Sequence, residues 1–367
     1  MPDPPLPGLG EHVGGRYYQL TKGSFGEAGS AVDVSRTNPQ PVDDWKLEIP
    51  RGNRPGLSPM IKFGENPNIN NSGDFFHLWD ATGLYAPPTI PRIHNVASDN
   101  AADAGNTIVS GTATGGSVLT LVDTSENFVT AGVVAGDIVL SDTNCDIGIV
   151  SSVATDTLTV NGFRDPETGF FGDAISAGDS YRVVHEGSTG ACVVYLQGLD
   201  SSFLLVNEFV VLNGISDVAT VNSYIRQYRA RSFGTTRVAT LVGVLTSTAV
   251  GDGTVSCQIN DGKNQTQMAI YTIPFDKNAY ILQWWGSLSK AVNAISIINL
   301  RVGQLDGFGY IVQPWSLSAS GQSSFCYEWG TRLPLPGGAD IWIEANSNLP
   351  STGVSGGFDI ILVDKVS

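Results

Sequence analysis

Short apolar runs that alternate with glycine-containing turns dominate the sequence from residue 105 onward. Apolar and polar residues alternate at 296–302 and again at 340–345, with the period expected of half-buried strands. The chain has 367 residues, of which 43 are glycine and only 15% are charged. Long amphipathic helices need charged solvent-facing sides, whereas glycine supplies tight turns between strands. Because 41% of the residues are hydrophobic, the chain has enough apolar surface for a core, and the sequence predicts an all-β protein.

The charge balance is strongly acidic. Twenty basic and 35 acidic side chains give a net charge of −15, and a phosphate-binding surface needs the opposite sign, so we expect no nucleic acid partner. The N-terminal MPDPPLPGLG has neither a basic start nor an apolar stretch, and nowhere do about 18 apolar residues follow one another. We therefore expect no secretory signal and no membrane span. The four cysteines form no C-x-x-C pair and are expected to be reduced core thiols: Cys145, Cys192, Cys257 and Cys326.

Residues 1–75 are interrupted by many prolines and glycines. Proline removes a backbone donor, so a regular sheet is not expected to run through this segment. A free solvated tail would seldom keep as many aromatic residues as this segment contains, which include Tyr17, Tyr18, Trp45 and Phe63. The sequence therefore predicts an extended arm that lies on its own protein or on a neighbouring subunit. The alternative is a disordered linker.

The rest of the chain divides into two predicted β regions. Residues 105–186 contain five or six short strand-like runs, and the tripeptide Ala-Gly-Asp precedes a strand-like run at two places in this region. They are expected to form a small β-barrel or sandwich inserted into a larger domain. Residues 76–104 and 187–367 are expected to form that larger domain, a β-sandwich of jelly-roll type. Tyr224 and Tyr228 have helical spacing, but alternation in the same segment favours a strand.

No sequence motif predicts catalysis, a metal site or a cofactor. The GVSGG motif around Ser355 matches a nucleophile elbow, but a strand-like run follows it and all four histidines precede it, so a hairpin loop is favoured. Residues 142–148 offer alternating oxygens but lack the glycine and glutamate of a calcium loop. The histidines form no pair with metal-ligand spacing. Carboxylate pairs for glycoside hydrolysis are defined in space, so the sequence leaves them open.

Adjacent tryptophans give the clearest indication of a recognition surface. Neighbouring residues of a strand point to opposite faces, so at most one of Trp284 and Trp285 enters a given core. The other is available to anchor a partner or to stack on a sugar ring, unless a neighbouring subunit covers it. Trp315 and Trp329 are further candidates for contacts between subunits.

Three segments resemble a family of tailed-bacteriophage virion structural proteins. The first is LQGLDSSFLLVNEFVVLNGISDVATVNSYIRQYRA, and the others are NQTQMAIYTIPFDKNAYILQWWGSLS and the terminal GGFDIILVD. The resemblance covers residues 76–104 and 187–367. It departs from the family pattern at Phe275 and Asp276, where the family more often has a small residue and glycine, and at the 105–186 interruption. The interrupting module is itself similar to small β-barrels of phage structural proteins.

The resemblance implies a non-enzymatic virion protein with no catalytic residue to carry over. We expect an external capsid-associated decoration or fibre-like protein, because its acidic charge would repel packaged DNA. It would assemble as a homotrimer through its N-terminal arm and β-sandwich. We expect it in the virion, which is assembled in the host cytoplasm, in contact with other virion proteins, namely capsid or tail subunits. The alternative is a receptor- or carbohydrate-binding module of a tail or fibre, which would contact a host surface glycan through exposed aromatics and the projecting 105–186 module. A polysaccharide depolymerase is the least favoured hypothesis, because no catalytic constellation is legible.

Overall fold

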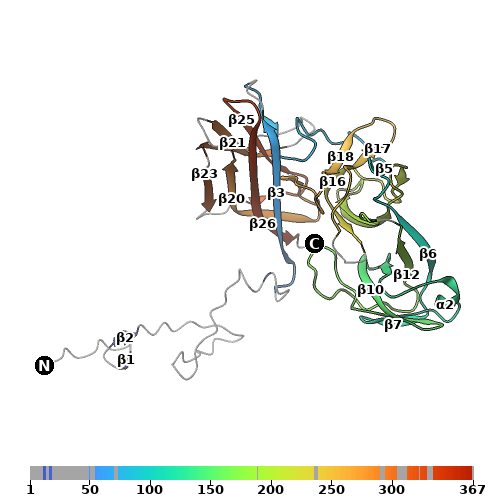
Figure 1. The fold of residues 1–367 in the computed structure, drawn as a ribbon. Helices are drawn as coiled ribbons and strands as arrows, with labels where there is room; N and C mark the ends of the chain where they lie inside the picture. The colour runs from blue at the N-terminus through green and yellow to red at the C-terminus, as the bar shows by residue number, and fades with distance from the viewer. Residues whose placement is uncertain are drawn as a thin grey trace. The chain divides into compact units, whose positions relative to one another are not determined.

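The computed structural model describes residues 11–13, 16–18, 49, 54–69, 73–187, 189–234, 239–289, 294–303, 312–321, 323–328 and 334–365. The chain divides into two compact units, Met1–Pro55 and Gly56–Ser367. In the first unit, β1 (Glu11–Val13) and β2 (Arg16–Tyr18) form an antiparallel hairpin. The second unit contains the remaining described sheets, whose paired strands are all antiparallel (Figure 1). A bilayer-spanning helix is not found among the described residues, whose one helix has four residues.

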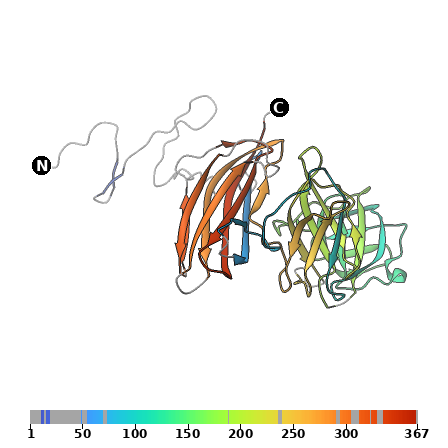
Figure 2. The ribbon, with the colours of Figure 1, turned by 90° about the horizontal axis from the view of Figure 1, so that it is seen from above.

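Two sheets built from residues 57–78 and 269–364 pack face to face (Figure 2). One sheet has the order β23 (Ser323–Glu328), β20 (Lys277–Leu288), β26 (Thr352–Asp364) and β3 (Leu57–Ile69), and β24 (Pro334–Leu335) also pairs with β20. The other has the order β19 (Ile270–Thr272), β25 (Asp340–Ser347), β21 (Ile295–Gly303) and β22 (Val312–Ser320), and β4 (Phe76–His77) also pairs with β25.

The order of these strands is that of a jelly roll. β4 and β19 occupy one position beside β25, and β23 and β24 occupy one position beside β20, which leaves eight positions along the chain. Numbered along the chain, these positions are β3, β4 with β19, β20, β21, β22, β23 with β24, β25 and β26. One sheet contains positions 6, 3, 8 and 1 in that order, and the other contains positions 2, 7, 4 and 5. This interleaving is the double Greek-key order of an eight-stranded jelly roll. The predicted all-β, jelly-roll-like class is therefore observed.

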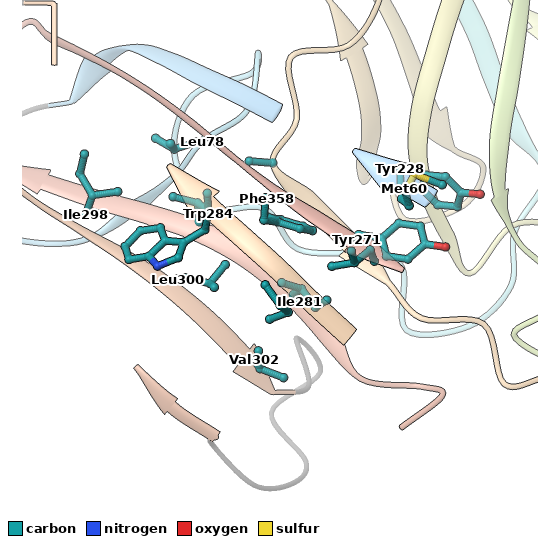
Figure 3. Packing of buried hydrophobic residues seen from close by; sticks show 14 of the residues in the cluster. Met60, Leu78, Tyr228, Tyr271, Ile281, Trp284, Ile298, Leu300, Val302 and Phe358 are labelled. Atoms are coloured by element: carbon teal, nitrogen blue, oxygen red, sulfur yellow. The ribbon is translucent and has the colours of Figure 1, made fainter. Parts of the chain in front are cut away.

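The jelly-roll core lies between the two sheets (Figure 3). Alternate residues of each strand face inward, and they include Ile281, Trp284, Ile298, Leu300 and Phe358, all at most 2% exposed. Trp284 is the largest fully buried side chain among the described residues, and its ring packs edge-on against Phe325 with the centroids 4.9 Å apart. Burial of such apolar side chains is the main favourable term in folding, so these strands hold the two sheets together.

The second strand position is interrupted by a long insertion. Leu78 donates to the carbonyl of Ile343 at 3.0 Å, Ile343 donates to Ala269 at 3.0 Å, and Ala269 donates to Leu78 at 2.9 Å. The chain therefore leaves the sheet at Leu78 and re-enters it beside the same residue, so that residues 79–268 form an insertion within one strand. The predicted sandwich of 76–104 plus 187–367 differs from this layout, because residues 79–104 and 187–268 belong to the insertion.

The segment just before this insertion also differs from expectation. β3 was expected to lie in an arm without sheet structure, but it pairs with β26 from Leu57 to Ile69. Pro59 and Pro67 are tolerated because β3 is the edge strand of its sheet, where one side of the backbone needs no ladder partner. The arm prediction therefore extended too far toward the C-terminus. The arm's remaining residues lie largely outside the described part of the chain.

Part of the insertion forms a middle unit of two further sheets. The strand order of one is β14 (Leu205–Val211), β13 (Val193–Leu199) and β16 (Arg226–Phe233). The order of the other is β15 (Val218–Ala219), β5 (His94–Ser98), β17 (Leu245–Ala249) and β18 (Val255–Ile259). They share a separate core that includes Val96, Leu196, Tyr224 and Ile259. The segment with ambiguous tyrosine spacing contains no helix, and its second half is a strand, as predicted. Tyr228 belongs to β16, and Tyr224 forms an isolated antiparallel bridge with Arg92.

A small barrel is nested inside this middle unit. Its strand order is β6 (Gly105–Thr112), β12 (Ser180–Glu186), β9 (Ile138–Ser141), β10 (Asp146–Val153), β11 (Thr157–Val160), β8 (Thr120–Val122) and β7 (Gly115–Ser117). The first and last strands of this order, β6 and β7, are consecutive in the chain and are joined by two residues. The strands enclose a core that contains Leu121, Phe128, Leu158, Phe163 and Tyr181. Phe128 begins the helix α2 (Phe128–Ala131). This is the inserted barrel predicted for 105–186.

Ion-pair and hydrogen-bond contacts join the barrel, the middle unit and β3. Glu167 of the barrel is paired with Arg229 of β16 at 2.7 Å and accepts from the amide of Gln197 at 2.7 Å. Arg231 donates to the backbone carbonyl of Glu167 at 2.5 Å. Lys62 of β3 is only 2% exposed, donates to the carbonyl of Tyr228, and has its pKa well below the usual range because burial disfavours its charge. These contacts come from residues far apart in sequence and hold the modules in register.

A substitution at Gly64 tests the strand interruption. A Cβ at Gly64 would lie 2.3 Å from the backbone nitrogen of Ala269 and 2.3 Å from the carbonyl oxygen of Leu78. Because those backbone atoms hold the re-entry point, Gly64→Ala should lower the free energy of unfolding by roughly 3 kcal/mol or more. Gly115→Ala is the matched control, since no atom lies within 4 Å of its Cβ position. Urea unfolding of both variants measures the difference, and equal stability would contradict the predicted clash.

Buried neutral histidines predict a loss of stability in acid. The ring of His94 donates from Nδ1 to the Arg92 carbonyl at 3.0 Å and accepts at Nε2 from the Ser256 hydroxyl at 2.8 Å. Burial lowers the pKa of His94 from 6.5 to about 4, and burial has the same effect on His77. Between pH 6.5 and about pH 4, these histidines bind protons in the unfolded chain but not in the folded chain. The free energy of unfolding therefore falls as the pH falls through this range.

The variant His94→Gln should reduce this acid sensitivity. Its loss of stability between pH 7 and pH 4 should be smaller than that of the wild type by up to roughly 3 kcal/mol. Urea unfolding of both proteins at the two pH values gives the comparison. Burial raises the pKa of Asp80 to about 7, which by itself makes the folded protein more stable as the pH falls. Because both proteins contain Asp80, this contribution cancels when their losses of stability are compared. An identical decline in both proteins would show that His94 is not buried in its neutral form.

Candidate binding face of the jelly roll

The two adjacent tryptophans of β20 have different environments. Trp284 is fully buried between the two sheets, so the prediction that it contacts a partner is wrong. Trp285 is partly exposed and, by strand alternation from the buried Trp284, lies on the outer face of the sheet β23–β20–β26–β3. Strand alternation explains the division, because successive side chains point to opposite faces. Trp285 therefore stays the candidate recognition residue of this pair.

Strand register places a second predicted aromatic residue on the same face as Trp285. Trp285 is paired with Gly357 of β26, and Gly357 is paired with Phe63 of β3, so the three residues form a row across the sheet. A Cβ at Gly357 would lie 2.7 Å from Cζ2 of Trp285, which shows that the indole lies over the glycine. Phe63 is partly exposed, and its neighbour Ile61 is 55% exposed. The row is an apolar platform that glycine makes flat.

Polar side chains stand on both sides of this platform. On one side, the Gln283 amide donates to the carboxylate of Asp359. On the other, the hydroxyls of Ser287 and Ser355 are hydrogen-bonded at 2.7 Å, and Glu65 is paired with Ser355 in the strand register. Burial raises the pKa of Asp359 above its usual value, and the Gln283 hydrogen bond opposes this shift. We call the platform and these flanking residues the aromatic face.

A pocket of about 440 Å³ adjoins the aromatic face. Its lining combines hydroxyl, amide and carboxylate groups with short apolar segments: Glu65, Asn66, Pro67, Ser289, Ser351, Gly353, Val354 and Ser355. The volume lies within the range usual for small-molecule sites. Glu65 stands at its edge and is ion-paired with Lys263 through Oε1. An aromatic platform beside a polar pocket is suited to a ligand that has both an apolar surface and many hydroxyl groups.

The structure also explains why the motif at Ser355 is not a nucleophile elbow. Ser355 lies inside the long strand β26, and its hydroxyl is bonded to that of Ser287.

The 142–148 segment, compared above with a calcium loop, includes the turn between β9 and β10. Asp142 in this turn accepts two hydrogen bonds from Arg182, at 2.9 and 2.6 Å. In the described part of the chain, no group of three or more His, Cys, Asp or Glu side chains is placed to hold a metal ion.

The cysteines are free, as predicted, but one is not in a core. Cys192 and Cys257 are buried and Cys145 is partly buried, whereas Cys326 is exposed on β23. Burial raises the pKa of the Cys192 and Cys257 thiols to about 12. Cys326 is paired with Trp285 in the register, and its thiol lies 3.8 Å from Oε1 of Gln283. It gives the aromatic face a natural site for chemical labelling.

The structure does not describe the side chains of several predicted contact residues. Trp45 and Trp329 lie outside the described residues. Tyr17 and Tyr18 belong to β2, and Trp315 belongs to β22, but only the backbone of these residues is described. Of the eight predicted contact residues, the structure therefore brings together only Trp285 and Phe63, on the aromatic face. Their contribution to subunit contacts stays a prediction.

Sequence reasoning missed the residues that complete the aromatic face. Gly357, Asp359, Gln283 and Glu65 come from three strands, and no motif links them: Gly357 ends the GVSGG segment, which the sequence predicted only as a hairpin loop. The alternation of GGFDI and QWWGS shows which side chains share a face of their own strand. It does not show which strands are neighbours, because β3 and β26 are separated by most of the chain.

The contrasting burial of the two tryptophans predicts contrasting stability effects. Trp284→Ala should lower the free energy of unfolding by about 3–5 kcal/mol, because it leaves a large cavity in the core. Trp285→Ala should cost no more than about 1 kcal/mol, because the ring is partly solvated. Urea unfolding of the two single variants measures both values. Equal costs would contradict the assignment of Trp285 to the outer face.

Comparison with known proteins assigns no family to this chain. No protein-family model matches the sequence, and no curated protein matches it. A functional proposal therefore depends on the jelly-roll topology, on the geometry of the aromatic face and on the residues that carry the sequence resemblance.

Proposed function

We propose that this chain is a non-enzymatic structural component of a bacteriophage virion. The single observation that carries the proposal is the jelly-roll strand order, an architecture that viral capsid proteins use repeatedly. Fold alone does not define function, so the proposal also depends on the segments that resemble phage virion proteins. One of these segments forms most of β13, β14 and β16, and another forms β19 and β20.

The net charge supports an external position in the particle. With a charge of −15, the chain would be repelled by packaged DNA, and an outer position as a decoration or fibre-like protein avoids that repulsion. The nested insertion suits such a protein, because the middle unit and barrel are added at one strand position without changing the jelly-roll order. We propose capsid or tail subunits as partners and a closed homotrimer as the assembly state.

Recognition of a receptor glycan is the second candidate function. The observation that favours it is the flat row Trp285–Gly357–Phe63 with a polar pocket beside it. A virion protein is able to combine both roles, since one face of the jelly roll can bind a ligand while other surfaces contact subunits.

Labelling of intact particles tests the virion assignment. Antibody raised against the purified protein should decorate the outside of particles that carry this chain, and mass spectrometry should find the chain in those particles. Light scattering of the purified protein should give the mass of a trimer. A monomeric protein that is absent from every purified particle would overturn the proposal. Particles that contain the chain but exclude antibody would place it inside the shell and contradict the charge argument.

A further inference from the structure

The aromatic face has the composition of a sugar-binding site. A pyranose ring presents a face of C–H groups and an edge of hydroxyl groups, so it needs an apolar surface and polar groups close together. Trp285 supplies a ring laid over Gly357, where no side chain separates the indole from the sheet. Phe63 extends this surface across the sheet. Aromatic rings of this kind give a large contact area at small conformational cost, because they have few rotatable bonds.

The polar groups stand where the edge of such a ring would reach them. Ser287 and Ser355 form the next row across the sheet, one step of two residues along β20 and β26 from Trp285 and Gly357. Glu65 ends that row and also lines the pocket. Hydroxyl and carboxylate oxygens are acceptors for sugar hydroxyl groups, and the serine hydroxyls are also donors. The 440 Å³ pocket continues from this row and gives room for a further part of the ligand.

The charges around the face select among saccharides. Glu65 and Asp359 lie on it, and the exposed Glu328 is paired with Gln283 at its edge. Lys263 is already paired with Glu65. Lys62, which directly precedes Phe63 on β3, is buried on the inner face of the sheet. An anionic glycan would meet carboxylates that have no free cation beside them in the described part of the face. Charge therefore favours a neutral glycan.

We propose that the aromatic face binds a neutral pyranose oligosaccharide, with Trp285 as the stacking residue and Glu65, Ser287 and Ser355 as hydrogen-bonding residues. The inference rests on the second candidate function and is independent of the virion assignment. Of the two places that the sequence indicated, an exposed tryptophan of the 284–285 pair and the projecting 105–186 module, it places recognition at the first, on the jelly roll. A site built on paired strands holds its groups more firmly than one built on loops.

Calorimetric titration of the full-length protein tests this site. The probes are maltohexaose, cellohexaose, mannohexaose and chitohexaose, with a hexasaccharide of guluronate as the anionic comparison. At least one neutral probe should bind, and the guluronate probe should bind more weakly. Trp285→Ala should weaken binding about tenfold or more, Trp285→Phe should weaken it less, and Glu65→Gln should weaken it several-fold. Phe170→Ala is the matched control, because Phe170 is a 69% exposed aromatic of the barrel.

A second readout locates the ligand without relying on affinity. Cys326 is the exposed thiol among the four cysteines and is paired with Trp285 in the register. The bound oligosaccharide should slow the reaction of Cys326 with a maleimide reagent, and this protection should disappear in Trp285→Ala. The stability of each variant, measured by urea unfolding, separates loss of the site from loss of the fold.

The outcomes distinguish the site from the two functional proposals. Absence of binding by every neutral probe at millimolar concentration would overturn both the site and glycan recognition, and would leave the virion assignment to its own test. Binding that is lost in Phe170→Ala but kept in Trp285→Ala would retain glycan recognition and overturn this site in favour of the barrel. A change in molecular mass on Trp285→Ala, without glycan binding by the wild type, would identify the face as a contact between copies.

Discussion

The backbone hydrogen bonds that connect Leu78, Ala269 and Ile343 are the constraint on which the rest of the architecture depends. They let one strand position be shared by two short segments, β4 and β19, with the whole middle unit and barrel between them. The close approach requires Gly64, since any side chain there would meet backbone atoms of both segments. A jelly roll can accept so long an insertion because the two ends of the interruption stay side by side, and the long loop costs little extra closure entropy.

The aromatic face follows from the same sheet. Because β3 pairs with β26, Phe63 and Gly357 become neighbours of Trp285, although almost three hundred residues separate Phe63 from Gly357. Glycine has a similar function at both places. At Gly64 it lets two backbone segments approach, and at Gly357 it lets an indole lie on the sheet. The glycine-rich composition thus serves close packing within strands as well as the turns between them.

Much of the fold was predictable because its signals are local. Alternation and turn residues indicated the strands of the barrel and the strand identity of β16. The arm prediction failed at β3 because proline is excluded from central strands but accepted at an edge, and edge position depends on the neighbours of a strand. The sandwich prediction merged the middle unit with the jelly roll for a similar reason. Both have strands of similar pattern, and only their separate cores distinguish them.

The amino-acid sequence by itself determined the all-β class, the inserted barrel and the rule that Trp284 and Trp285 point to opposite faces. These properties depend on neighbouring residues, whose side-chain directions follow from the two-residue period of a strand. Only the tertiary structure decided which tryptophan is buried, which strand stands beside which, and which polar groups flank Trp285. Those properties depend on register between segments far apart in the chain, and a shift of one residue would exchange the buried and exposed faces.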